Sequence, residues 1–149
     1  MIRVVKFEPE HLYKMDLLEV FQGDEDVRER VRDHSTEPSC VCNTLLCPDG
    51  SVLGVVGMTL VTDGYGSLWS LLSQRVKDYP VGFHKCVKWL INHFWVECNL
   101  YRIDTHVEAD NLKACKQNEL WGLTPEARLK RTSPRGKDEI VFSRVRDGC

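Results

Sequence analysis

The sequence lacks any apolar run long enough to cross a membrane as a helix. None of its stretches approaches the roughly 20 apolar residues that such a helix requires. The charged start, MIRVVKFEPE, also lacks the apolar core of a secretory signal. We therefore expect no membrane partner and a cytoplasmic location.

The sequence also lacks an excess of charge of either sign. Lys and Arg number 20 against 22 Asp and Glu, which gives a formal net charge of -2. Proteins that bind nucleic acid through its phosphates generally carry a clear basic field. The charge balance therefore predicts no nucleic-acid partner.

The sequence is rich in cysteine but lacks the closely spaced cysteine pairs that bind structural zinc. The chain has seven cysteines, an odd number, at irregular intervals. The tightest group is Cys40, Cys42 and Cys47, with His34 as a conceivable fourth ligand. Alternation along a strand places Cys40 and Cys42 on one face and Cys47 on the other. We expect buried or idle thiols and no metal site or disulfide framework.

Hydrophobic periodicity predicts an α+β (mixed α/β) chain that forms a single domain over residues 1–149. The predicted strands are residues 3–7, 40–47, 52–61, 67–72 and 100–107, with a closing hairpin from 126–133 and 138–145. The predicted helices are residues 9–23, 24–33, 83–98 and a segment capped by Asp110 that runs to Trp121. No repeat, linker or low-complexity tract interrupts this order.

Two motifs within this order carry a family resemblance. The run GVVGMTLV, at residues 54–61, is a glycine-framed apolar strand, and Asn111-x2-Ala114-x7-Gly122-Leu123 spans the last predicted helix. The first resembles the third strand of the Gcn5-related N-acetyltransferase (GNAT) family, and the second resembles its N-x-x-A-x-x-L-Y-x-K-x-G-F motif. The resemblance covers almost the whole chain. It implies a GNAT-like fold with a central mixed, mostly antiparallel sheet of about seven strands and helices on both faces.

The resemblance further implies an acyl-CoA-dependent N-acetyltransferase, with acetyl-CoA as co-substrate and an amine of a protein or small molecule as acceptor. Coenzyme A would be bound by the end of the strand at 67–72, by the start of the following helix and by the asparagine motif. The implied cofactor-binding residues are Leu71, Leu72, Ser73, Lys77, Val81, Gly82, Phe83, Asn111 and Ala114. Two alternatives stay open, since residues 76–82 also suit an ordinary strand-to-helix connection and Asn111 suits an Asx turn.

The chain departs from the family pattern where the coenzyme A diphosphate would bind. The family's loop reads Q/R-x-x-G-x-G/A, because unhindered amides at a helix start must surround the phosphates. Residues 76–81 read VKDYPV, so neither key glycine is present, Pro80 removes one donor and Asp78 adds a negative charge. Gly82 and Lys77 are the residues that could replace the lost contacts.

The catalytic positions depart as well. The family's usual general acid, a tyrosine in the last helix, corresponds to Asn118, whose amide can donate a hydrogen bond but cannot protonate a thiolate. The strand SLWSLLS offers no glutamate as a base. The candidate bases implied by the resemblance are His106 and Glu108.

These departures leave a second functional class open. The opening MIRVVKFEPEHL and the segment YPVGFHKCVKWL resemble divergent GNAT-like proteins of tailed bacteriophages. That resemblance implies a catalytically degenerate protein that binds a host or virion protein, and it would place the chain in the host cytoplasm or the virion.

Overall fold

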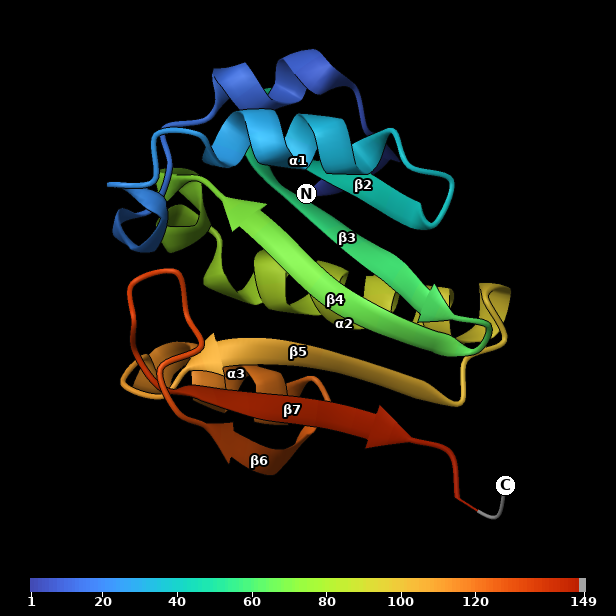
Figure 1. The fold of residues 1–149 in the computed structure, drawn as a ribbon. Coiled ribbons are helices and arrows are strands. Elements are labelled where there is room, and N and C mark those ends of the chain that lie inside the picture. Colours follow the sequence, from blue (N-terminus) through green and yellow to red (C-terminus); the bar gives the residue numbers. More distant parts are fainter. Residues whose placement is uncertain (148–149) are drawn as a thin grey trace. The chain divides into compact units, whose positions relative to one another are not determined.

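The computed structural model describes residues 1–147 and contains one seven-stranded sheet. Its strands are β1 (Arg3–Lys6), β2 (Cys40–Leu46), β3 (Val52–Thr62), β4 (Tyr65–Leu72), β5 (Arg102–Glu108), β6 (Thr124–Leu129) and β7 (Glu139–Val145). They follow the order β1-β2-β3-β4-β5-β7-β6 (Figure 1). β4 pairs with β5 in parallel, whereas the β1–β2, β2–β3, β5–β7 and β6–β7 pairs are antiparallel. The predicted mixed, mostly antiparallel sheet is confirmed.

Three α-helices and three short 3₁₀ helices accompany the strands. The α-helices are α1 (Val27–Ser35), α2 (Pro80–Glu97) and α3 (Leu112–Leu120). The 3₁₀ helices are η1 (Pro9–Lys14), η2 (Glu19–Phe21) and η3 (Gln74–Asp78). No helix within residues 1–147 is both long enough and apolar enough to span a bilayer.

The chain divides into two compact units, which we describe one at a time. The first comprises Met1–Thr59 and Trp69–Trp89, and the second comprises Leu60–Leu68 and Leu90–Cys149. The chain passes between them within β3, β4 and α2. That residues 1–149 behave as one domain stays a prediction.

In the first unit, the predicted helix over residues 9–23 is wrong. This segment forms η1 and η2, and between them the backbone is extended, with Leu17 bridged to Ser73. The Leu18 amide donates to the Leu72 carbonyl at 3.0 Å, and the Gln74 amide donates to the Asp16 carbonyl at 2.7 Å. These long-range bonds replace the bonds that a continuous helix would make. The apolar residues of the segment are still buried, in a cluster of Leu12, Met15, Leu17, Val52, Val55 and Leu71.

A close approach between strands explains one glycine of the GVVGMTLV run. A Cβ added to Gly57 on β3 would lie 2.3 Å from an atom of the Trp69 indole. The Trp69 ring therefore occupies the space that any larger residue at position 57 would need. This contact fixes Trp69 over β3.

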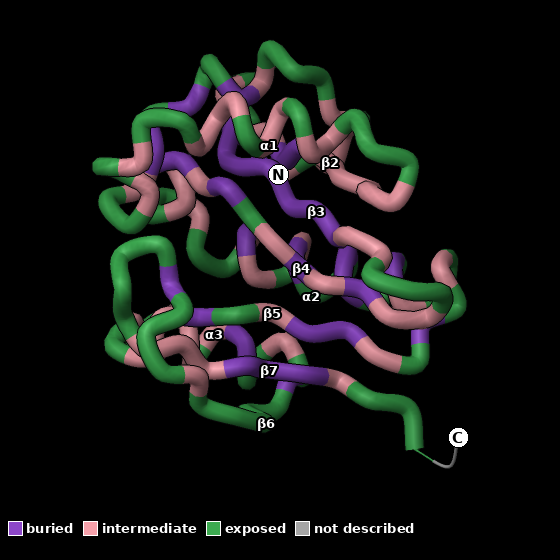
Figure 2. The backbone as a smooth tube through the Cα atoms, viewed as in Figure 1, coloured by how far each residue is buried: buried purple, intermediate pink, exposed green. Residues whose placement is uncertain are grey.

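In the second unit, β5 has a partner strand on either side. It pairs in parallel with β4 over residues 102–104, and it pairs with β7 along its whole length, from Arg102 to Glu108. Figure 2 shows buried stretches along both β5 and β7, which hold Ile103, Val107, Val141 and Phe142. The β5–α3 connection leads directly into the asparagine motif.

Candidate functional site

The residues predicted to bind coenzyme A fall in both units, and those of the first unit surround the start of α2. Ser73, at the end of β4, is buried and fully bonded to the protein. Its amide donates to the Leu53 carbonyl at 3.0 Å, and its hydroxyl donates to the Val52 and Leu53 carbonyls and accepts from the Arg75 amide. Leu71 is buried, and the Leu72 carbonyl accepts from Leu18. The strand end thus anchors the loop, and the Ser73 amide is not available to a ligand.

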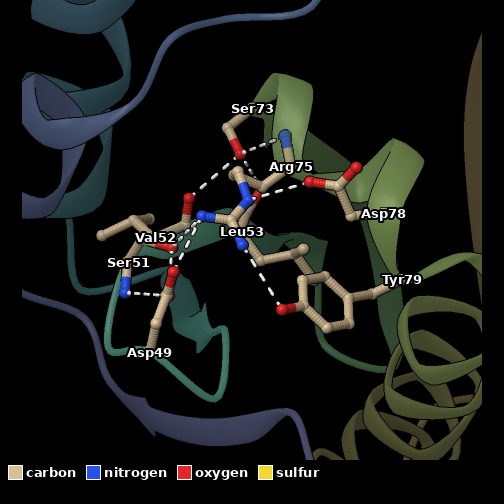
Figure 3. A network of polar contacts seen from close by, with 8 residues as sticks. All are labelled: Asp49, Ser51, Val52, Leu53, Ser73, Arg75, Asp78 and Tyr79. Atoms are coloured by element: carbon tan, nitrogen blue, oxygen red, sulfur yellow. Dashed lines mark hydrogen bonds and ion pairs between the residues drawn. The ribbon is translucent and has the colours of Figure 1, made fainter.

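Arg75 connects this loop to the turn between β2 and β3 (Figure 3). Its Nη1 donates to Asp49 Oδ2 at 2.9 Å and to Ser51 Oγ at 3.0 Å. Its Nε donates to Asp78 Oδ2 at 3.1 Å, and its Nη2 donates to the Tyr79 hydroxyl at 3.3 Å. Hydrogen bonds from Ser51, together with Arg75, hold the pKa of Asp49 well below its usual range. The guanidinium therefore fixes the path of η3 ahead of α2.

Lys77 lies on the same loop and is also paired within the protein. Its Nζ donates to Glu19 Oε1 at 2.8 Å. This hydrogen bond lowers the pKa of the Glu19 carboxyl. Both side chains are largely exposed, so the pair is a weak surface contact that a stronger anion can displace.

The first turn of α2 presents unused backbone donors. Pro80 is the first helical residue, and the Phe83 amide donates to the Tyr79 carbonyl at 2.9 Å. The amides of Val81 and Gly82 meet no acceptor among residues 1–147, and Val81 is 65% exposed. A Cβ at Gly82 would lie 3.0 Å from the Ile2 side chain, so packing also favours glycine there. Two free donors at the positive end of an 18-residue helix suit an anionic ligand.

In the second unit, Asn118 is turned into its own helix. It is 5% exposed, and its Nδ2 donates to the Ala114 carbonyl at 2.8 Å. Its Oδ1 is buried and has no hydrogen-bond partner within residues 1–147. An enclosed amide bonded in this way has no proton to give to a leaving thiolate.

The two candidate bases at the end of β5 differ in their surroundings. Glu108 accepts from Arg135 Nε at 3.1 Å and from Ser133 Oγ at 2.8 Å, and the Arg135 bond lowers the pKa of its carboxyl. A carboxylate held in this way is a weaker base. His106 is exposed, and its Nδ1 lies 3.6 Å from Glu139 Oε1. His106 is therefore the more accessible of the two.

Asn111 and Ala114 form the N-terminal cap of α3. The Asn111 Oδ1 accepts from the Ala114 amide at 3.2 Å, so Asn111 and not Asp110 caps this helix. The hydrogen bond expected if Asn111 forms an Asx turn is therefore present. A role in binding the pantetheine arm stays a prediction.

Sequence reasoning missed a buried charged cluster in the second unit. Asp104 on β5 accepts from the Tyr65 hydroxyl at 2.7 Å and from Arg102 Nη2 at 2.9 Å. Arg102 also forms an ion pair with Glu126. The hydrogen bond to Asp104 raises the pKa of Tyr65. The one available sequence signal was an acid within a strand, two residues from an arginine on the same face.

Residues 1–147 contain no group of three or more His, Cys, Asp or Glu side chains that could hold a metal ion. The cysteines described there are free thiols: Cys40, Cys42, Cys47, Cys86, Cys98 and Cys115.

Comparison with known proteins gives matches among solved structures alone. No family model and no curated protein matches the sequence. A chimera of the spermidine N-acetyltransferase SpeG from Vibrio cholerae and hSSAT has a TM-score of 0.75 at 13% identity, covering 97% of this chain and 95% of its own. Mutant forms of the spermidine/spermine N-acetyltransferase SpeG from Vibrio cholerae give 0.74 at 14% identity, covering 97% and 95%. SpeG in complex with manganese ions gives 0.70 at 15% identity, covering 97% and 92%. The chain therefore has the GNAT fold that these acetyltransferases share.

Proposed function

We propose that this protein is an acyl-CoA-dependent N-acetyltransferase that transfers acetyl from acetyl-CoA to an amine of a small molecule or protein. The observation that carries the proposal is the pair of free amides at Val81 and Gly82, at the start of α2 in a GNAT fold. The similar solved structures are of enzymes named for acetylating spermidine, which supports an amine as the acceptor class.

The residues present fit a diphosphate better than the bare loop sequence indicates. The carboxylate of Asp78, which would repel phosphate, is paired with Arg75. Lys77 is held only by an exposed contact with Glu19 and can turn toward a phosphate. Pro80 supplies no donor, but it stands at the first helical position, where its missing N–H is least costly.

Acetyl-CoA supplies the activated thioester, and this chain supplies binding and orientation. Holding the acceptor amine and the thioester together is itself a large contribution to rate. We assign the base to His106, because Glu108 is occupied by Arg135 and Ser133. We assign no acid role to Asn118, because its amide is buried and bonded within α3.

The test is calorimetric titration with acetyl-CoA of the wild-type protein and of variants at the exposed residue Val81. Val81→Asp adds a negative charge where the phosphates would lie, and an acid in the first turn does not harm the helix. We expect wild type to bind and Val81→Asp to bind about tenfold or more weakly. The isosteric Val81→Asn is the neutral control and should bind as wild type does. Absence of heat with the wild-type protein at millimolar acetyl-CoA would contradict the proposal.

One observation favours a second candidate, a catalytically degenerate phage GNAT-like protein that binds a host or virion protein. Neither Asn118 nor Glu108 is in a state suited to proton transfer. Affinity capture from a bacterial lysate separates the two functions. A binding protein should retain its partner after Lys77→Ala and Asn118→Ala are combined, provided that circular dichroism shows the double variant folded, and it should show no acetyl transfer.

A further inference from the structure

One carboxylate of the second unit, that of Glu139, has no lysine or arginine partner within residues 1–147. Three acids at the same end of β5 and β7 each pair with a base: Glu108 with Arg135, Asp110 with Lys137 and Asp138 with Arg128. The Glu139 side chain is only 13% exposed, and a carboxylate so far from water is costly without a partner. Its ion-pair partner is His106.

The register of the sheet places Glu139 beside His106. Across the β5–β7 ladder, His106 lies opposite Val141, and Glu139 is two residues before Val141 on β7. Residues two apart on a strand share a face, so Glu139 is a diagonal cross-strand neighbour of His106. The His106 Nδ1 lies 3.6 Å from Glu139 Oε1. The two side chains are therefore brought together by strand pairing.

The other two carboxylates on this face of β5 are already paired. Asp104 and Glu108 alternate with His106 along the strand, and they form ion pairs with Arg102 and Arg135 respectively. Within residues 1–147, no hydrogen bond engages the His106 ring, so its Nε2 is unused. Glu139 is thus the carboxylate that can act on this histidine.

A carboxylate beside one ring nitrogen decides where a neutral imidazole carries its proton. The nitrogen that faces the carboxylate carries the N–H, and the other nitrogen keeps its lone pair. With Nδ1 of His106 toward Glu139, Nε2 is the nitrogen that is free to accept a proton. The separation of 3.6 Å is longer than a hydrogen bond, as is common for catalytic pairs before substrate binds.

We propose that Glu139 is a positioning residue that holds His106 as its Nδ1–H tautomer, so that Nε2 can take a proton from the acceptor ammonium. This inference rests on the proposed transferase function, in which His106 is the base. One N–H bond of the ammonium breaks, its proton binds Nε2, and the nitrogen keeps the electron pair with which it attacks the thioester. The imidazolium then donates its Nδ1–H to Glu139, which stays ionised and stabilises the positive charge. Solvent finally takes the proton from Nε2.

The test reads the tautomer directly, by long-range proton–nitrogen NMR of the folded full-length protein. The spectrum is taken at about pH 9, at which a histidine ring is ordinarily neutral, and the His106 signal is the one lost in His106→Gln. In wild type, we expect the proton on Nδ1. Glu139→Ala should move it to Nε2, the nitrogen that a free imidazole side chain prefers to protonate. Glu139→Gln keeps a carbonyl acceptor and should retain the Nδ1–H form.

Glu108→Ala is the matched control, because it removes another carboxylate from the same end of the β5–β7 ladder. With the fold checked by circular dichroism, this variant should leave the His106 tautomer as in wild type. An unchanged tautomer in Glu139→Ala would overturn the proposal, and so would an equal change in Glu108→Ala. Wild-type His106 protonated on Nε2 would overturn it as well, whether or not Glu139→Ala folds.

Turnover gives a second readout, with acetyl-CoA as donor and spermidine as the probe amine. We expect Glu139→Ala to lower kcat about tenfold with little change in KM, and Glu139→Gln to lower kcat by less. Equal losses in the two variants would contradict a positioning role. The NMR measurement needs no acetyl-CoA. A wild-type protein with the expected tautomer but no turnover would therefore contradict the proposed transferase activity, while the effect of Glu139 on His106 would stand.

Discussion

At the scale of single residues, Asn111, which precedes α3, and Asn118, within it, use their side-chain amides differently. Asn111 stands at the helix start and accepts from the Ala114 amide, whereas Asn118 lies in the second turn and donates to the Ala114 carbonyl. The first satisfies a backbone donor that has no partner within the helix. The second buries an amide where the GNAT pattern has a tyrosine, and this is why it carries no acid role in our proposal.

Replacing Asn111 with alanine should destabilise the protein by about 1 kcal/mol, the usual value of an N-cap side chain. The lost Oδ1 leaves the Ala114 amide without its acceptor. Urea denaturation followed by circular dichroism measures the change. Asn111→Ser keeps a capping oxygen and should remain close to wild type, so equal losses in the two variants would show that capping is not the cause.

At the scale of elements, the connection between β4 and α2 is an ordered 3₁₀ turn and not an open loop. Ser73 fixes its first residue, and Arg75 ties it to Asp49, Asp78 and Tyr79 (Figure 3). Because the path of this turn sets where α2 begins, Arg75 positions the free amides of Val81 and Gly82 without contacting them.

Arg75→Lys should loosen this turn while keeping the charge, because an ammonium cannot reproduce the forked contacts of a guanidinium. We expect the Val76 and Tyr79 amides, which donate to carbonyls within the turn, to exchange with deuterium about tenfold faster. Arg30→Lys is the matched control, since Arg30 makes a forked pair with Asp24 outside the turn. Unchanged exchange at Val76 and Tyr79 would rule out a positioning role for Arg75.

At the scale of the whole chain, the net charge is close to zero, and many of the carboxyl groups are hydrogen-bonded to basic or hydroxyl side chains. Hydrogen bonds to a basic or hydroxyl partner lower the pKa of Asp24, Asp49, Glu108, Asp110 and Glu126. A carboxyl with a lowered folded pKa stabilises the protein above its unfolded pKa. That contribution is lost as the pH falls through the folded pKa.

The urea midpoint should therefore be nearly level from about pH 6 to 7 and should fall as the pH drops below about 4.5. Denaturation at stepped pH values measures this slope. Glu108→Gln removes the carboxyl held by Arg135 and Ser133, so its midpoint should fall less steeply over the same interval. A midpoint that rises on acidification would contradict the sign of these shifts.

Local sequence patterns predicted a helix or strand well where its conformation depends mainly on its own residues. The α2 segment was predicted over residues 83–98 and extends over Pro80–Glu97, because its apolar spacing is strongly helical. The segment at 9–23 has similar spacing but forms two short turns, because Leu17 and Leu18 bond to the end of β4. Helical spacing of apolar residues predicts which residues are buried but not the backbone conformation, because an extended backbone can bury the same residues.

The mixed α+β class, the strands, the longest helix and the missing glycines of the phosphate loop all follow from local sequence, since each depends on residues close together in the chain. Three long-range contacts, by contrast, appear only in the folded chain: Arg75 reaches Asp49, Arg135 pairs with Glu108, and Trp69 lies over Gly57. These contacts join residues separated by many positions. Their partners depend on strand register and loop path, which no local pattern encodes.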